Sequence, residues 1–129
     1  MISKEKIRLF VRETLGCTCP DEVFQHVDCR AGENTLLDYE IDVGNRLLIF
    51  VASIDRETPL KSLIQQLAWD GINKRNVEDF NRFRLVLLAE MPTDFADEAS
   101  AIFQSLGADD KVHLHVVSKD GFPARNVHF

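Results

Sequence analysis

The sequence predicts an α/β protein built on one mixed β-sheet covered by helices. Two observations support this fold class. An alternating run at 37–43 and an apolar run at 47–52 flank Gly44-Asn45, as in a β-hairpin. Beyond residue 58, segments with helical spacing alternate with short apolar runs, as in helical crossovers between parallel strands. The predicted order is α-α-β-β-α-β-α-β, with four to five strands in the sheet.

Composition indicates one globular domain covering residues 1–129. The chain has 129 residues, of which 45% are hydrophobic and 28% charged, enough for one core. Its 15 basic and 21 acidic residues give a net charge of −6. Because this charge opposes binding to phosphate backbones and anionic lipids, we expect neither nucleic acid nor a membrane as partner.

Two further features favour a cytoplasmic protein. The first fifteen residues mix basic with acidic side chains and contain no apolar run typical of a secretory signal. The longest strongly apolar run, 47–54, is too short to cross a bilayer. With three cysteines and no export signal, we expect reduced thiols rather than a disulfide framework.

The N-terminal part predicts two helices. From Ser3 to Leu15 apolar residues recur at helical spacing, Ser3 is a suitable cap, and Gly16 is placed to end the helix. A short second helix is predicted from Pro20 to Val27, since Gly32 and Asn34 then interrupt the pattern.

The hairpin has an outer and an inner strand. In the outer strand, 37–43, apolar residues alternate with Asp38, Glu40 and Asp42, which predicts one solvent-facing side. The inner strand, 47–52, is apolar on both faces, as expected for a covered central strand.

The C-terminal half supplies the crossovers. Thr58-Pro59 begins a long helix, 83–89 is an apolar strand, and Thr93 or Asp94 caps a helix that Gly107 ends. The last clear strand is 112–117. Residues 118–129 are predicted to form a turn and an irregular or edge segment.

Two cysteines, Cys17 and Cys19, lie one residue apart before Pro20. A proline at the first helical position makes Cys19 the expected N-cap, where the helix dipole favours a thiolate. One interpretation is a redox dithiol, with Cys29 as resolving or third thiol. The alternative is structural: Cys17 is a small buried hydrophobe, and Cys19 is only a cap.

Zinc or iron could also bind at these cysteines. The segment containing Cys17, Cys19, His26 and Cys29 has the ligand types of a structural zinc site. In a continuous helix, however, Cys19 and His26 would lie roughly 10 Å apart along the axis. A single metal centre therefore requires that the helix be broken.

The acidic strand face permits two interpretations. Asp38, Glu40 and Asp42 could bind a divalent cation, or they could keep an exposed sheet edge soluble. The order of helix, hairpin and helix-strand resembles restriction-endonuclease-like folds, which place catalytic acids on such strands. That family requires an acidic-x-Lys sequence on the central strand, where this chain has Phe50-Val51-Ala52-Ser53. The resemblance therefore implies a fold without the nuclease active site.

Two histidines, His113 and His115, alternate with apolar residues, so they share one face of the last strand. This spacing is compatible with metal binding or with a polar sheet surface.

A pocket is predicted beyond the carboxyl ends of the parallel strands, where open α/β sheets bind ligands. The residues expected there are Ser53, Asp55, Glu90, Ser118 and Lys119. Such a pocket would suit a small-molecule enzyme. The sequence contains no glycine-rich phosphate loop and no nucleophile elbow that would identify a reaction.

The function that the sequence favours is an interaction or accessory module with a protein partner or a second copy of itself. Trp69, Phe122 and Phe129 are the candidate interface aromatics. Thiol redox or metal chemistry at Cys17 and Cys19, and small-molecule catalysis at the strand ends, are the alternatives.

Overall fold

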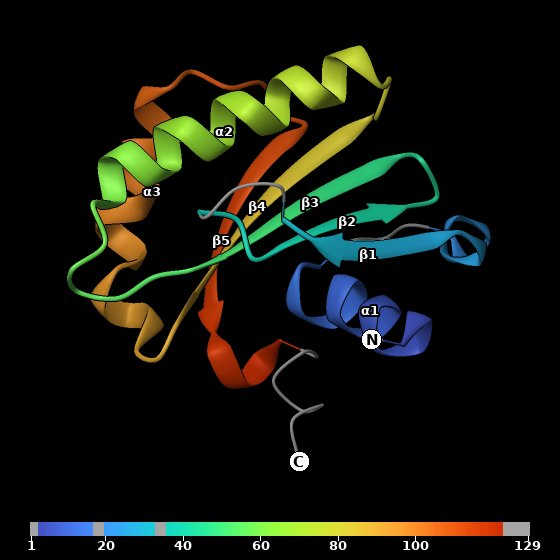
Figure 1. Ribbon diagram of the computed structural model, residues 1–129, viewed down its shortest axis with the longest axis horizontal. Coiled ribbons are helices and arrows are strands. Elements are labelled where there is room, and N and C mark those ends of the chain that lie inside the picture. Colours follow the sequence, from blue (N-terminus) through green and yellow to red (C-terminus); the bar gives the residue numbers. More distant parts are fainter. Residues whose placement is uncertain (1–2, 17–19, 33–35, 123–129) are drawn as a thin grey trace.

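A computed structural model describes residues 3–16, 20–32 and 36–122. Its centre is one mixed five-stranded sheet in which the strands follow one another in chain order (Figure 1). The strands are β1 (Val27–Ala31), β2 (Tyr39–Val43), β3 (Leu47–Ser53), β4 (Arg82–Ala89) and β5 (Val112–Ser118). The first three strands are antiparallel, whereas β3, β4 and β5 run parallel.

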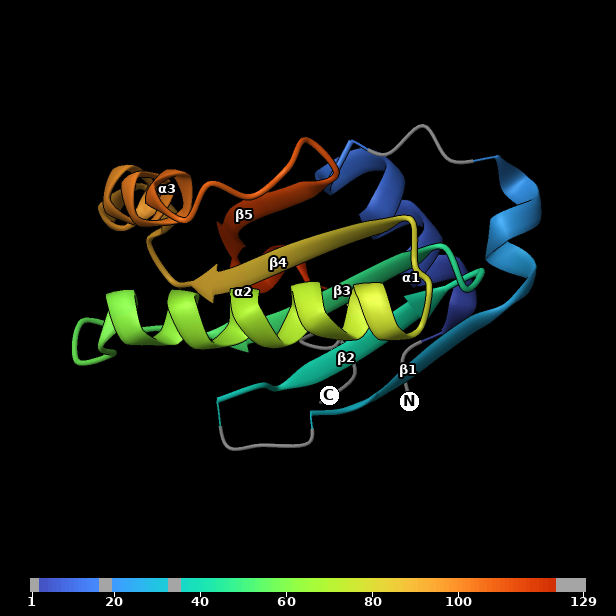
Figure 2. The same ribbon diagram turned by 90° about the horizontal axis from the view of Figure 1, so that it is seen from above.

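Helices cover both faces of this sheet. On one face lies α1 (Lys4–Leu9), which continues into a π-helical turn, η1 (Phe10–Thr14). On the other face lie α2 (Leu60–Val77) and α3 (Ala96–Ser105), and Figure 2 shows α2 running lengthwise over the middle of the sheet. Short 3₁₀ turns complete the fold: η2 (Asp21–Gln25), η3 (Pro92–Asp94) and η4 (Lys119–Gly121).

The predicted mixed sheet with covering helices is confirmed. As expected, Ser3 caps the first helix, accepting a hydrogen bond from the Lys6 N–H at 3.2 Å. Gly16 follows that helix with φ +70°, a conformation that favours glycine.

The segment 20–27 differs from the predicted second helix. It forms only the turn η2, and the chain then enters β1, a strand that the sequence pattern did not predict. Sheet pairing explains the difference, because Val27 and Cys29 lie opposite Val43 and Ile41 on the apolar face of β2.

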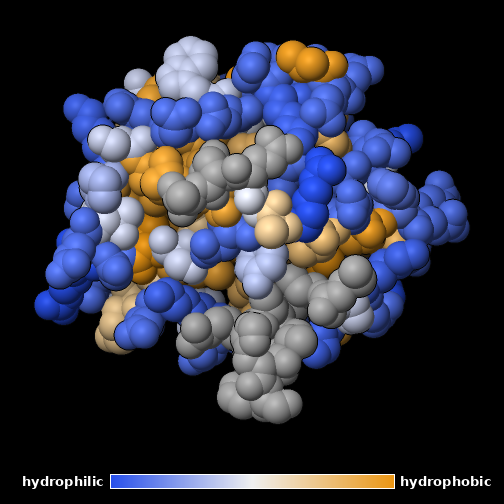
Figure 3. All heavy atoms as spheres, in the orientation of Figure 1, coloured by the Kyte–Doolittle hydropathy of each residue, from blue (hydrophilic) through white to orange (hydrophobic). Residues whose placement is uncertain are grey.

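The two central parallel strands carry the core. Leu47, Ile49 and Val51 of β3 pack beneath α1, whereas Leu48, Phe50 and Ala52 pack beneath α2. In β4, Val86 and Leu88 join the first layer, and alternate residues from Phe83 to Ala89 join the second. Figure 3 shows the molecule from the same side as Figure 1. Hydrophilic side chains surround the visible surface, and hydrophobic side chains show through to the left of the centre.

One glycine, Gly71 in α2, is required by packing. A Cβ atom at this position would lie 2.0 Å from the Phe83 Cζ atom. The Phe83 ring is fully buried and makes an edge contact with Phe50, with ring centroids 5.1 Å apart. Because the Phe83 ring is fully buried, α2 can pass this close to it only at a residue without a side chain.

We therefore predict that Gly71→Ala destabilises the protein by about 1–3 kcal/mol, because overpacking outweighs the gain of about 1 kcal/mol in helix propensity. The measurement is the free energy of unfolding in urea, with Asn76→Ala, at an exposed position of the same helix, as control. Equal or higher stability of Gly71→Ala would show that α2 has room to shift.

Candidate functional site

A cavity of about 630 Å³ lies where β3, β4 and β5 end. Its walls come from the loop after β3, the segment from the end of β4 through η3, and the residue after β5. The lining residues are Ile54, Asp55, Arg56, Glu57, Glu90, Met91, Asp94, Phe95 and Lys119. This is the edge at which parallel strands of open sheets present their ligands.

Three of the predicted strand-end residues, Asp55, Glu90 and Lys119, line this cavity. Ser53 does not. Its backbone N–H and its hydroxyl both donate to the Asp38 carboxylate, at 2.9 and 2.6 Å. Ser118 caps η4, where its hydroxyl accepts from the Asp120 N–H at 3.2 Å.

The Asp55 loop is fixed by local hydrogen bonds. The carboxylate of Asp55 accepts from the Glu57 N–H at 2.9 Å and from the Thr58 hydroxyl at 3.1 Å. Thr58 Oγ1 in turn accepts from the Asp55 N–H at 2.9 Å. These bonds hold the start of the crossover to α2 in one turn conformation.

Charge gives the cavity its chemistry. Four carboxylates and two cations line it, and the cation of Arg56 lies 3.9 Å from Asp94. Met91, which is 60% exposed, and Phe95 add apolar surface. Within the described residues, no group of three or more histidine, cysteine, aspartate or glutamate side chains is placed to hold a metal ion. The arrangement suits an organic ligand with a cationic group.

The residues that form the active site of restriction-endonuclease-like proteins are absent from the corresponding strand. Residues Phe50 to Ser53 of β3 contain neither the acidic residue nor the lysine of that family's motif. The carboxylate of Asp38, just before β2, accepts its hydrogen bonds from Ser53.

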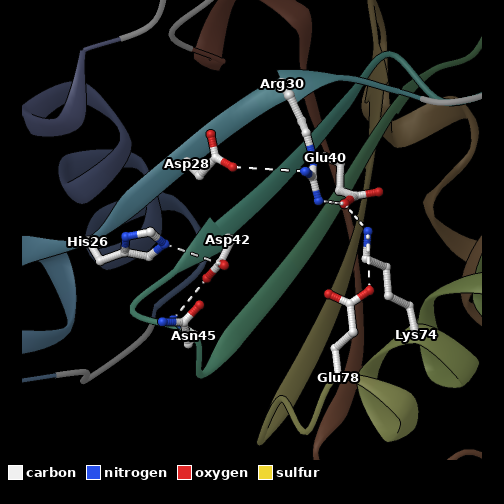
Figure 4. Close-up of polar contacts among 8 residues, drawn as sticks. All are labelled: His26, Asp28, Arg30, Glu40, Asp42, Asn45, Lys74 and Glu78. Atoms are coloured by element: carbon white, nitrogen blue, oxygen red, sulfur yellow. Dashed lines mark hydrogen bonds and ion pairs between the residues drawn. The ribbon is translucent and has the colours of Figure 1, made fainter.

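The strand β2 is not at the edge of the sheet, because β1 pairs with it, and α2 reaches its acidic face through Lys74. The prediction of a solvent-facing row is therefore wrong for Glu40, which is 4% exposed. Figure 4 shows its carboxylate between Arg30 of β1 and Lys74 of α2. The distance from Arg30 Nη2 to Glu40 Oε2 is 2.7 Å.

Burial raises the pKa of Glu40, but hydrogen bonds from Lys74 and Arg30 outweigh burial and hold this pKa below its ordinary value. Lys74 also lies 3.7 Å from Glu78, and Arg30 lies 4.0 Å from Asp28 (Figure 4). Glu40 therefore joins the covering helix to the antiparallel half of the sheet.

The two described members of the proposed metal set are not together. The His26 ring lies 3.5 Å from Asp42 (Figure 4). Cys29 instead packs against the apolar layer beneath α1. Burial raises the pKa of the Cys29 thiol, and the neighbouring Asp28 raises it further, so its thiolate is disfavoured. Cys17 and Cys19 lie outside the described residues.

Arg84 is a second buried charged residue, and unlike Glu40 it has only neutral hydrogen-bond partners. It was not identified from the sequence. It is 7% exposed and lies on β4, facing α1. Its Nη1 donates to the Leu15 carbonyl at 3.0 Å and lies 2.7 Å from His115 Nε2. The sequence signal was available, because an arginine interrupts an otherwise apolar strand whose two faces are both covered.

The aromatic residues proposed for an interface differ in their burial. Phe122 is buried, which overturns its assignment as an exposed aromatic, and its ring centroid lies 5.1 Å from that of Phe10 and 5.4 Å from that of Tyr39. Trp69 is 68% exposed. Phe129 lies outside the described residues.

We predict that Glu40→Gln lowers the free energy of unfolding by about 2–3 kcal/mol at neutral pH, because the mostly buried Lys74 and the more exposed Arg30 lose the buried carboxylate that they share. Since the pKa of Glu40 is lowered in the folded protein, its contribution is present above the unfolded pKa of about 4.3 and lost as pH falls through the folded value. The difference between wild type and variant in urea unfolding should therefore shrink in acid.

The matched control for this measurement is Glu78→Gln, which removes a more exposed partner of Lys74 and should cost about 0.5 kcal/mol or less. A difference that stays constant from neutral to strongly acidic pH would contradict the ion-pair explanation.

Comparisons of the chain with protein-family models, with curated proteins and with solved structures found no match. Among the described residues, no helix has both the length and the apolar character needed to cross a membrane.

Proposed function

We propose that this protein is an interaction module that pairs with a second copy of itself through the open edge of β5. The observation that supports this proposal is the composition of that edge. From Val112 to Ser118 the strand carries no acidic residue, lysine or arginine, and its side chains from His113 onward are partly exposed. A long uncharged edge strand is a template for pairing with another strand.

The backbone of β5 has groups available for such pairing. The Phe83 N–H donates to the Lys111 carbonyl, and Phe83 lies opposite Val112. In this parallel register the odd-numbered residues of β5 bond to β4, so the peptide groups of Leu114 and Val116 point away from the sheet. Within the described residues, neither of these two peptides has a backbone hydrogen-bond partner on its outer side.

The opposite edge of the sheet is protected. Asp28 and Arg30 place charges of both signs on β1, and β1 is shorter than β5. Charged side chains and short length are the usual protection of an edge strand. This asymmetry favours β5 over β1 as the pairing edge.

The β5 sequence also suits antiparallel pairing with itself across a two-fold axis. In the register that pairs all seven residues, Leu114 of one copy lies opposite Val116 of the other, and the two His115 side chains meet at the axis. The pKa of His115 is lowered to about 4, by burial first and then by Arg84 and His113, so these imidazoles are neutral at physiological pH. No like charges therefore face one another.

Proline at position 116 tests this edge, because Val116→Pro removes an outward N–H and leaves the bonds between β5 and β4 in place. We expect wild type to have twice the monomer mass by size-exclusion chromatography with light scattering. Val116→Pro should raise the dissociation constant at least about tenfold, since each dimer loses two hydrogen bonds and gains two clashes.

The matched control is Ala31→Pro, which removes an outward N–H from the β1 edge and should leave association unchanged. Circular dichroism checks that both variants keep the fold. A strictly monomeric wild type, or equal loss of association in both variants, would reject pairing through β5. Pairing of β5 with an extended peptide of another protein would appear as a monomer that binds such a peptide.

Small-molecule binding at the strand-end cavity is a second candidate function, supported by the convergence of Asp55, Glu90 and Lys119 on one cavity. Redox or metal chemistry at Cys17 and Cys19 stays a prediction.

The strand-end candidate predicts that an alkyl diamine such as cadaverine shifts the amide NMR signals of residues 54–57, 90–95 and 119. Glu90→Gln should weaken this binding at least about threefold, because it removes one unit of attraction for the ammonium group. Glu98→Gln, an exposed carboxylate of α3 outside the cavity lining, is the control. Shifts spread over all acidic surface residues would contradict a specific cavity.

A further inference from the structure

Arg84 is a buried cation whose hydrogen-bond partners are both neutral. Its two hydrogen-bond partners are a backbone carbonyl and an imidazole, and its Nε has no partner in the described part of the chain. No carboxylate of the described residues lies within ion-pair distance of it.

An uncompensated guanidinium is costly to bury. Removing a charge from water without a counterion is unfavourable by several kcal/mol, which hydrogen bonds to neutral groups offset only in part. Burial and the positive charge of Arg82 both lower the pKa of Arg84, so its surroundings disfavour the cation. Glu40 provides a comparison within the same molecule. Burial disfavours its ionised form too, but two cations compensate its charge.

More basic groups surround Arg84 on the same face. Arg82 precedes it by two residues on β4, and His113 lies directly opposite it on β5. His115, two residues further, bonds to it. Arg82 is exposed and both histidines are partly exposed, so the cluster of Arg82, Arg84, His113 and His115 opens to solvent near the β5 edge.

The acidic residues of the segments on this side of the sheet make no ion pair with Arg84. In α1, Glu5 pairs with Arg8 at 2.7 Å. Asp21, which precedes β1, pairs with Arg12 at 2.6 Å. Glu13 of η1 is exposed and makes no ion pair with Arg84. Among the described residues, therefore, no carboxylate pairs with this cluster of basic side chains, in a protein of net charge −6.

We propose that this cluster is a binding site for a tetrahedral oxyanion of the phosphate class. Arg84 supplies the buried charge, held in place by Leu15 and His115, and Arg82 and His113 supply donors at the open side. A guanidinium suits two oxygens of one phosphate at once. The site lies on the face of the sheet that carries α1, apart from the strand-end cavity, and does not depend on pairing through β5.

Inorganic phosphate is the probe. Thermal unfolding and calorimetric titration of the full chain, at neutral pH and constant ionic strength, should show saturable binding and a raised unfolding temperature. Arg82→Gln should raise the dissociation constant at least about threefold, because one charge is lost at the open side. Lys61→Gln, which removes an exposed cation of α2 on the opposite face of the sheet, should leave the dissociation constant unchanged.

A substitution at His115 separates anion binding from a purely structural role of Arg84. His115→Glu supplies a carboxylate of similar reach, so it should raise the unfolding temperature without phosphate by about 2–4 °C and remove the response to phosphate. The matched variant, His115→Gln, keeps a neutral acceptor and should keep the response.

The proposal fails if wild type shows no saturable phosphate binding, or if His115→Glu responds to phosphate as strongly as wild type. Equal stabilisation of every variant, Arg82→Gln included, would identify a general salt effect and also overturn it. Sulfate in place of phosphate distinguishes the bound species, since selective binding of sulfate would contradict the phosphate class.

Discussion

The constraint on which this structure depends is that β3 and β4 are buried on both faces. A strand with two apolar faces is stable only when both are covered. The chain covers one face with α1 and the other with α2 and α3, and it extends the sheet sideways with β2, β1 and β5. The close approach of Gly71 to Phe83 follows from this constraint, because α2 covers the sheet by packing directly against it.

Two charged groups, Glu40 and Arg84, are the buried ones among the described residues, and they are accommodated differently. Glu40 has cations from a neighbouring strand and from α2, so its charge links two elements. Arg84 has a carbonyl from the end of η1 and a histidine from β5, which position it without neutralising it. The two cations beside Glu40 account for its burial, whereas the proposed phosphate-class anion would supply the counterion that Arg84 lacks among the described residues.

Much of the fold was predictable because its signals are local. Alternation identified β2, apolar runs identified β3 and β4, and Thr58-Pro59 marked the start of α2. The strand β1 was missed because its alternation of apolar and charged residues spans only five positions, a signal too short to identify a strand without its pairing to β2. Asp55, Glu90 and Lys119 were predicted at the strand ends from topology alone. The arginine at position 84 was visible as an interruption of an apolar strand, but its lack of a carboxylate partner among the described residues depends on packing and could not be predicted.

The unequal edges of the sheet limit how large an assembly can grow. A sheet with two bare edges can add copies on both sides and extend into a ribbon without a defined end. This sheet carries charges on β1 and none on β5, so the proposed pairing uses only one of its two edges. Once two β5 strands had paired, both remaining edges would be charged β1 strands, and growth would stop at a closed pair. In that arrangement the charges of Asp28 and Arg30 would limit the size of the assembly, at a distance from the contact itself.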